Sequence, residues 1–179
     1  MFDAHHEILS TRATSWPAVS EARGANGRIG MKDAETRIVV RDFARSRREA
    51  LAVDCLRLVL SAQEDADMSH LARAYELAER QFERLMAVDY VRTLVSIARA
   101  LRREREFGFH FLRDAQDVLT SCEGEFLLGL QAAIDGNSIG VDAAALVLTQ
   151  APCGRAVAED LWRLGAFALT TDRIRRVEI

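Results

Sequence analysis

Few side chains in this sequence have the types and spacing that catalysis or metal binding requires. No Cys, Asp or Glu stands at the spacing of a metal motif such as His-Glu-x-x-His beside the histidines, which are His5, His6, His70 and His110. The glycines of residues 24–30 precede no Lys-Ser or Lys-Thr pair, and no Gly-x-Ser-x-Gly is present. The carboxylates are spread over many predicted helix faces and single out no acid–base pair. The sequence therefore predicts no metal and no cofactor, and an enzyme is only the third interpretation.

Arginines at helical spacing are a stronger signal, because their chemistry suits anionic partners. If residues 36–51 form one helix, four arginines share a face of it: Arg37, Arg41, Arg45 and Arg48. Such a basic amphipathic helix predicts binding to phosphates, to an acidic partner or to an anionic membrane surface. The alternative is a solvated helix face, since Asp42 and Glu49 stand beside the arginines. A shorter stripe with the same two interpretations is formed by Arg92, Arg99 and Arg103.

Residues 67–86 have the pattern of a helix-turn-helix. In that motif a first helix ends in a tight turn, and the second helix offers Arg, Gln or similar side chains to base edges in the DNA major groove. Leu71 would pack the first helix, and Phe82 with Leu85 would seat the second. The side chains left to face outward are Arg80, Gln81, Glu83 and Arg84.

The segment LARAYELAERQFERLM, residues 71–86, resembles the first helix-turn-helix of AraC-type bacterial transcription regulators, and YVRTLVSIARAL, residues 90–101, resembles the linker helix that follows it. The resemblance implies major-groove binding by residues 79–86. It departs from the family at Glu76, where Gly is usual, and at Ala78, where Ser is usual. An ordinary amphipathic core helix is the alternative, and an unbroken helix from Ser69 would exclude the motif. The residues that we assign to DNA are Arg80, Gln81 and Arg84 for bases, and Arg73, Arg92 and Arg99 for phosphates.

The elements that position these side chains are predicted to be helices. No Pro occurs between Ala18 and Ala151, and this segment is rich in Ala, Leu, Arg and Glu, which favour helices. Ser46 and Glu49 form a Ser-x-x-Glu capping box, so an almost wholly apolar, central helix is predicted from about residue 47 to 62. The preceding residues 36–43 suit a strand or a helix, and we favour the helix.

Further capping signals divide the rest of the chain. Thr120 and Glu123 repeat the capping box and predict a helix after them. Asp89 and Asp142 are predicted to cap two more helices. A last helix is expected to end at Thr170-Thr171-Asp172, residues 170–172. The fold class is therefore all-α.

The length of 179 residues and the net charge of −3 suit one compact multi-helix domain. We expect it to span residues 31–179, after a flexible tail at residues 1–30 or an incorrectly assigned start. No stretch approaches the roughly 18 apolar residues of a membrane-spanning helix, and the N-terminus lacks the pattern of a secretory signal, so we expect a cytoplasmic protein. The cysteines show no CxxC spacing and predict buried thiols: Cys55, Cys122 and Cys153.

These patterns favour a non-catalytic regulatory protein that binds DNA through residues 67–86. The alternative is a helical adaptor or subunit that binds no nucleic acid and buries an apolar face against a protein partner or a second copy of itself. Retention of the protein on DNA and the size of the purified protein would distinguish these two hypotheses.

Overall fold

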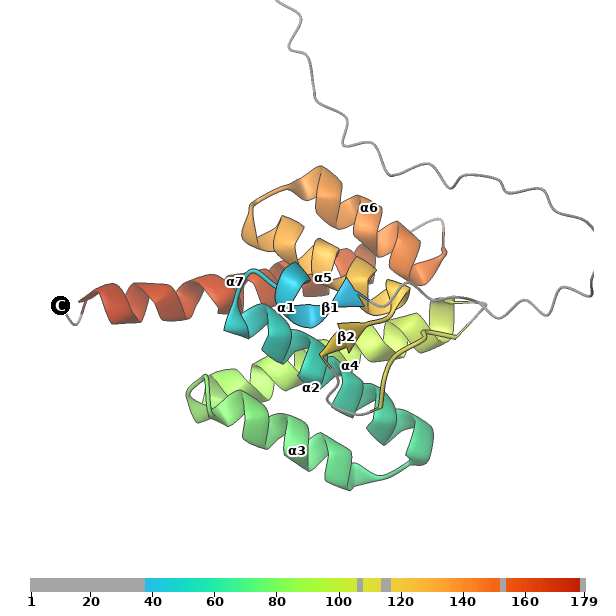
Figure 1. Cartoon of the computed structure of the whole chain (residues 1–179), viewed down its shortest axis with the longest axis horizontal. Helices are drawn as coiled ribbons and strands as arrows, with labels where there is room; N and C mark the ends of the chain where they lie inside the picture. The colour runs from blue at the N-terminus through green and yellow to red at the C-terminus, as the bar shows by residue number, and fades with distance from the viewer. Residues whose placement is uncertain (1–37, 106–107, 114–116, 152–153, 178–179) are drawn as a thin grey trace, which may run out of the picture. The chain divides into compact units, whose positions relative to one another are not determined.

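The computed structural model describes residues 38–105, 108–113, 117–151 and 154–177, which are mostly helical (Figure 1). Contacts divide the chain into two units, Met1–Asp33 and Ala34–Ile179, and the predicted tail lies outside the described residues. The all-α prediction is confirmed, since the two short strands pair only with each other. The elements are β1 (Ile38–Val39), α1 (Val40–Phe43), α2 (Arg47–Asp65), α3 (Met68–Glu79), α4 (Arg84–Glu104), β2 (Val118–Leu119), α5 (Ser121–Ile134), α6 (Ser138–Thr149) and α7 (Arg155–Val177).

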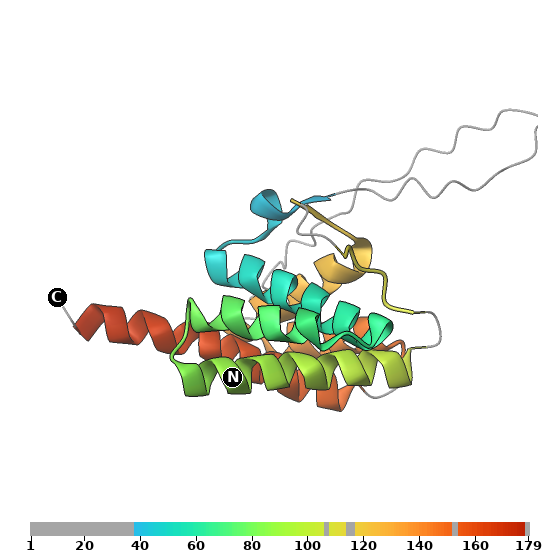
Figure 2. The same cartoon turned by 90° about the horizontal axis from the view of Figure 1, so that it is seen from below.

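Helix α2 is central, as its apolar sequence predicts. It packs against α3, α4 and α5, and Leu56 and Val59 are among its many buried side chains. Figure 1 shows α6 at the upper edge of the fold and α3 at the lower edge, with α2 and α5 between them. Figure 2 shows α7 continuing past the helices against which it packs. Within the described residues, no helix combines the length and the apolar character that crossing a membrane needs.

Two of the predicted helix starts are confirmed by their hydrogen bonds. The side chain of Ser46 accepts a bond from the N–H of Glu49 at the start of α2. At the start of α5, Thr120 and Glu123 form both bonds of a capping box. Because a cap satisfies backbone groups within a few residues of it, such starts are readable from local sequence.

Three other predicted boundaries are wrong. Asp89 lies inside α4, which begins after Glu83, and Asp142 lies inside α6, which begins after Asn137. Asn137 makes the capping bond, to the N–H of Gly140 at 3.0 Å. Helix α7 also continues through the predicted break at residues 170–172. Asp and Thr cost a helix interior less than about 1 kcal/mol each, so their presence alone does not end or begin a helix.

The helix break after Glu79 has a tertiary cause. Phe82 lies in the turn of residues 80–83 and is only 6% exposed. Its ring centroid lies 4.8 Å from that of Tyr90 and 6.2 Å from that of Phe167. Turning the chain places Phe82 in the core, although neither Gly nor Pro is present there.

This break contradicts the predicted boundaries of the helix-turn-helix. Glu76, where the turn was expected, and Ala78, at the expected start of the second helix, both lie within α3. The expected recognition helix, residues 79–86, contains the end of α3, the turn and the start of α4. One continuous helix from Ser69 is also wrong, because α3 and α4 are separate.

The predicted basic helix over residues 36–51 is interrupted. Residues 38–39 are extended, α1 covers only Val40–Phe43, and Ser46 begins a new helix. Arg41 and Arg48 therefore lie in two different helices, with Arg45 between them. The physical reason is the cap: Ser46 adopts an extended conformation, which ends any helix that precedes it.

A buried ion pair ties the loop before α5 to the central helix. Arg57 Nε lies 2.6 Å from Glu123 Oε1, and Arg57 Nη2 lies 3.0 Å from Glu123 Oε2. Arg57 Nη2 also donates to the backbone oxygen of Val118 at 2.6 Å, and Glu123 accepts from the N–H of Thr120 at 2.8 Å and of Leu112 at 3.2 Å. Both charged side chains are nearly fully buried. This bidentate pair fixes the path of the chain into α5.

Glycines allow α5, α6 and α7 to approach closely. A Cβ added at Gly129 would lie 2.9 Å from Ala144 Cβ and 2.9 Å from Leu161 Cδ1. A Cβ at Gly165 would lie 2.9 Å from Ala133 Cβ and 3.1 Å from the Ala133 carbonyl carbon. The helices could not hold this spacing with larger residues at those positions.

We expect Gly165→Ala to lower the free energy of unfolding by about 1–3 kcal/mol, because the new methyl group meets backbone as well as side chain. Gly124→Ala in α5 is the matched control, since a Cβ there meets nothing within 4 Å. The free energy of unfolding of this control should rise by about 0.5–1 kcal/mol, because Ala favours a helix more than Gly does. Urea unfolding followed by circular dichroism measures both, and equal shifts in the two variants would contradict this packing.

Candidate functional site

The described residues offer little for catalysis. Among them, no group of three or more His, Cys, Asp or Glu side chains is placed to hold a metal ion. His70 Nε2 lies 3.8 Å from Asp65 Oδ2 and 4.0 Å from Asp67 Oδ2 at the start of α3. His110 is exposed on a loop. The two described histidines therefore lie on different elements, one on a helix and one on a loop.

Two of the predicted partner-binding arginines, Arg45 and Arg48, bond to other residues of this protein. Arg45 Nη1 lies 2.6 Å from Asp135 Oδ2, which raises the pKa of the guanidinium through that hydrogen bond and charge. Arg48 donates to the backbone oxygen of Ala168. The side chains of Arg37 and Arg41 lie outside the described ones. Arg45 and Arg48 therefore link α5 and α7 to the start of α2.

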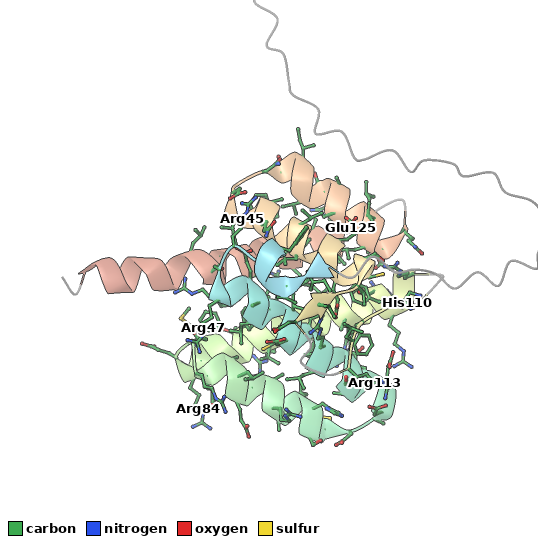
Figure 3. All side chains as sticks on the ribbon, viewed as in Figure 1. Arg45, Arg47, Arg84, His110, Arg113 and Glu125 are labelled. Atoms are coloured by element: carbon green, nitrogen blue, oxygen red, sulfur yellow. The ribbon has the colours of Figure 1, made fainter. Side chains whose placement is uncertain are left out.

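The predicted base-reading residues stand among acids. Arg80 and Gln81 lie in the turn of residues 80–83, and Arg84 is the exposed first residue of α4 (Figure 3). Arg84 Nε lies 3.9 Å from Glu79 Oε1. Two more exposed acids in this region are Glu76 and Glu83. This end of the α3–α4 pair is therefore of mixed charge.

The predicted phosphate-contacting residues are divided between two helices. Arg73 is exposed on α3, whereas Arg92 and Arg99 lie on the outward face of α4. Two further exposed arginines follow on α4, and we name the set the α4 ridge: Arg92, Arg99, Arg102 and Arg103. The sequence stripe of Arg92, Arg99 and Arg103 thus corresponds to one exposed face.

The positive charge of the α4 ridge is partly uncompensated. Arg92 Nη1 lies 3.5 Å from Asp89 Oδ1, and Arg103 Nη2 lies 2.5 Å from Glu104 Oε1. Among the described residues, Arg102 donates to the backbone oxygen of Gln63, at 3.4 Å, and to no acid. Within the described residues, Arg99 has no hydrogen bond or ion pair. The ridge thus has more basic groups than neighbouring acids.

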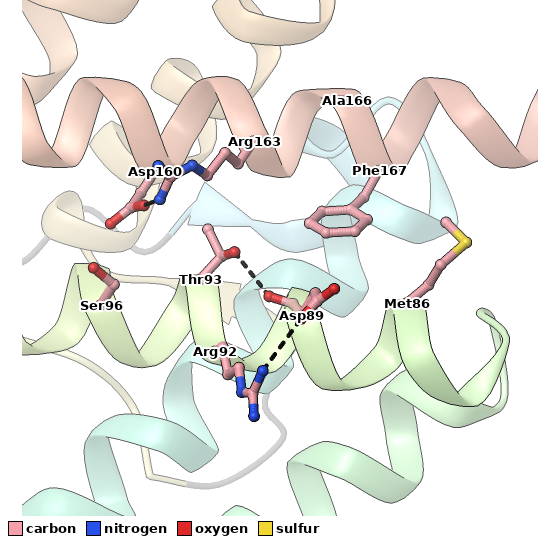
Figure 4. A pocket seen from close by; sticks show the side chains of 9 residues that line it. All are labelled: Met86, Asp89, Arg92, Thr93, Ser96, Asp160, Arg163, Ala166 and Phe167. Carbon is pink, nitrogen blue, oxygen red and sulfur yellow. Dashed lines mark hydrogen bonds and ion pairs between the residues drawn. The ribbon is translucent and has the colours of Figure 1, made fainter.

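A groove of about 690 Å³ lies between α4 and α7, on one side of the ridge (Figure 4). Met86, Ala166 and Phe167 line one end of it, and Ser96 lies toward the polar end. The other polar lining groups are Asp89, Arg92, Thr93, Asp160 and Arg163. The groove therefore offers an apolar end and a charged end.

The charged end is held in place by contacts within the two helices. Asp160 is nearly fully buried, and its Oδ1 lies 2.9 Å from Nη1 of the exposed Arg163. Thr93 Oγ1 donates to the backbone oxygen of Asp89 at 2.8 Å, as Figure 4 shows. The groove wall therefore presents one buried carboxylate beside two exposed guanidinium groups, those of Arg92 and Arg163.

A second hollow of about 400 Å³ lies on the other side of the ridge, between α4 and the α2–α3 pair. Its apolar lining comes from three helices and consists of Val59, Ala62, Met68, Leu71 and Val95. Arg99, Arg102 and Arg103 of the ridge line it as well. The α4 ridge is therefore flanked on one side by this apolar-walled hollow and on the other by the groove with its apolar end.

The sequence patterns identified Arg92, Arg99 and Arg103 of this surface but neither Arg102 nor the hollows. Asp160, Arg163 and Phe167 were assigned no role, because the contact of α7 with α4 is long-range and leaves no local signal. Two aromatic residues in the loop after α4 have structural contacts: Phe109 and Phe111 pack against the core, and Arg105 lies over the Phe109 ring at 5.7 Å from its centroid.

Comparisons of the chain with protein-family models, with curated proteins and with solved structures return no match.

Proposed function

We propose that this protein is a non-catalytic helical adaptor whose α4 ridge binds an acidic, amphipathic segment of a partner protein. The observation that supports this proposal is the combination of four exposed arginines with a hollow on each side, one mostly apolar and one with an apolar end. Amphipathic segments bind to grooves through apolar anchors at helical spacing. Carboxylates on the same segment match guanidinium groups in geometry and charge.

The contacts of the ridge suggest how such a segment binds. Its carboxylates pair with Arg99 and Arg102, which have no acidic partner among the described residues. Its apolar side chains enter the hollow beside Leu71 and Val95, or the end of the groove at Phe167. Burial of these anchors supplies most of the affinity, and the charges supply orientation and rate of association.

Duplex DNA is the competing ligand, since the same arginines suit phosphates. Two observations favour a protein segment. Phosphates would leave the apolar hollows unfilled, and Asp89 lies beside Arg92 at one end of the ridge, where it would repel a polyanion. The residues first assigned to bases are likewise surrounded by Glu76, Glu79 and Glu83.

The experiment is selection of a random peptide library on the full chain, followed by fluorescence anisotropy with the selected peptides. We expect peptides rich in Asp, Glu and large apolar residues, with binding that weakens at high salt. Arg92→Glu combined with Arg99→Glu should raise their Kd at least about tenfold, because two attractions become repulsions. Both residues are exposed, so the fold should persist.

The matched control is Arg80→Glu with Arg84→Glu, which changes the net charge equally but lies outside the ridge. Peptide binding should survive in this control. Selected peptides without acids, or equal losses in the two double variants, would count against the proposal. Mixed duplex DNA is tested in parallel: retention that the Arg80 and Arg84 changes abolish would instead favour DNA binding.

A further inference from the structure

The outer face of α6 is apolar although nothing in the described chain covers it. The inner face of α6 packs on α5 and α7 through Val141, Ala145 and Leu148, which are buried. The outer face carries Ile139, Leu146 and Val147, and Ile139 is 81% exposed. Asp142 is the one charged residue in the α6 sequence. A helix at the edge of a monomer would normally carry polar side chains there.

Neighbouring helices extend this apolar surface on both sides of α6. On the α5 side, Ala132 meets α6 at Gly140, where an added Cβ would lie 2.9 Å from Ala132 Cβ. Leu128 is one helical turn before Ala132 and is exposed. On the α7 side, Trp162 and Leu146 line a shared hollow of about 320 Å³. We name the combined surface the α6 face: Leu128, Ile139, Leu146, Val147 and Trp162.

We propose that the α6 face is a two-fold interface between two copies of this chain. Its five side chains are 36–81% exposed, which gives roughly 500 Å² of apolar surface if a large side chain presents about 200 Å². A dimer interface of ordinary size buries about 800 Å² on each partner. About 65% of a homodimer interface is apolar, or roughly 500 Å². The area of the α6 face therefore matches what a stable dimer needs.

The charged residues at the edge of the α6 face can pair with those of a second copy of the chain. Asp142, Arg155 and Glu159 line the hollow beside Trp162, and Arg155 Nε lies 2.9 Å from Glu159 Oε1. In a two-fold arrangement, contacts between two different residues occur twice, once in each direction. Asp142 of one copy can thus face Arg155 of the other, and the reverse. The face has no block of like charge that would select a strongly charged partner.

This interface is independent of peptide binding, because the α6 face and the α4 ridge consist of different residues. Sedimentation equilibrium of the full chain over a wide concentration range tests it. We expect the wild-type protein to have twice the mass of one chain. Ile139→Asp with Val147→Asp should raise the dissociation constant at least tenfold while circular dichroism stays unchanged. The milder Ile139→Ser should shift the equilibrium in the same direction.

The control is Leu85→Asp on α4, because Leu85 is also 81% exposed but lies outside the α6 face. It should remain a dimer. A monomeric wild-type protein at high concentration would overturn the inference, as would a dimer that survives the α6 substitutions or a complex with a different protein in place of the second copy. The monomeric α6 variant should still bind the selected acidic peptides, so failure of one proposal is distinguishable from failure of the other.

Discussion

Glu123→Ala is expected to lower the free energy of unfolding by about 3 kcal/mol, because it removes the bidentate acidic partner of the buried Arg57, whose guanidinium lies farther, 3.9 Å, from Asp54. The substitution also removes the acceptor for the backbone N–H groups of Thr120 and Leu112. Urea unfolding monitored by circular dichroism measures the loss. Glu125→Ala in the same helix is the control, since Glu125 is only half-buried, and it should change stability by less than about 1 kcal/mol.

The double variant Arg57→Met with Glu123→Met distinguishes the stability lost when Glu123 alone is removed from the contribution that the whole pair makes to stability. Replacing both members of a buried ion pair by apolar residues of similar size often changes stability little. The energetic cost of burying the two charges disappears together with their attraction. The double variant should therefore be more stable than Glu123→Ala. If Glu123→Ala unfolds at the same urea concentration as the wild type, the pair does not hold the loop to α2.

Loss of stability at alkaline pH is the second large effect, and it comes from Cys55 and Tyr90. Burial, with a smaller contribution from Asp54, raises the pKa of the Cys55 thiol from 9.0 to about 12. Burial is also the main cause that raises the pKa of Tyr90 well above its usual value. The unfolded chain therefore releases these protons at lower pH than the folded chain does. Stability falls as pH rises from 9 toward 12, because the unfolded state then binds fewer protons.

The size of this effect follows from the shift at Cys55. Each pKa unit corresponds to about 1.4 kcal/mol, so the full loss from this thiol is on the order of 4 kcal/mol. Cys55→Ser removes the titration and retains a donor toward the backbone oxygen of Ala74. Urea unfolding on either side of the thiol's ordinary pKa should show a shallower decline in this variant, and in Tyr90→Phe. Identical declines in all three proteins would show that neither group controls alkaline stability.

Local signals predicted part of the fold well. The caps at Ser46 and Thr120 were readable because each bonds to a backbone group three residues away. The start of α4 was not, since its N-cap Glu83 makes no side-chain capping bond and the preceding turn exists because Phe82 packs against Tyr90 and Phe167. The contact with Phe167 joins distant segments, so no short window of sequence contains the whole cause.

In the candidate site, too, local sequence predicted some residues, and long-range contacts determined others. Arg92, Arg99 and Arg103 share a face because helical spacing alone places them there, and the sequence stripe identified them. Arg45 and Arg48 have the right residue type but bond to Asp135 and to the Ala168 backbone, which only the fold brings near. The α6 face escaped prediction as well, because a short Ala- and Leu-rich helix does not reveal which of its sides a neighbour covers.

Helix α4 divides its two faces between different tasks, and this has an evolutionary consequence. Its inward residues Tyr90, Leu94 and Ala98 are buried in the core, whereas Arg92 and Arg99 are exposed and bear little on stability. Exposed substitutions usually change folding free energy by less than about 0.5 kcal/mol. If the outer face binds a partner as we propose, selection is free to alter what it recognises while the inner face keeps the fold, so new specificities are accessible by single steps without loss of the folded state.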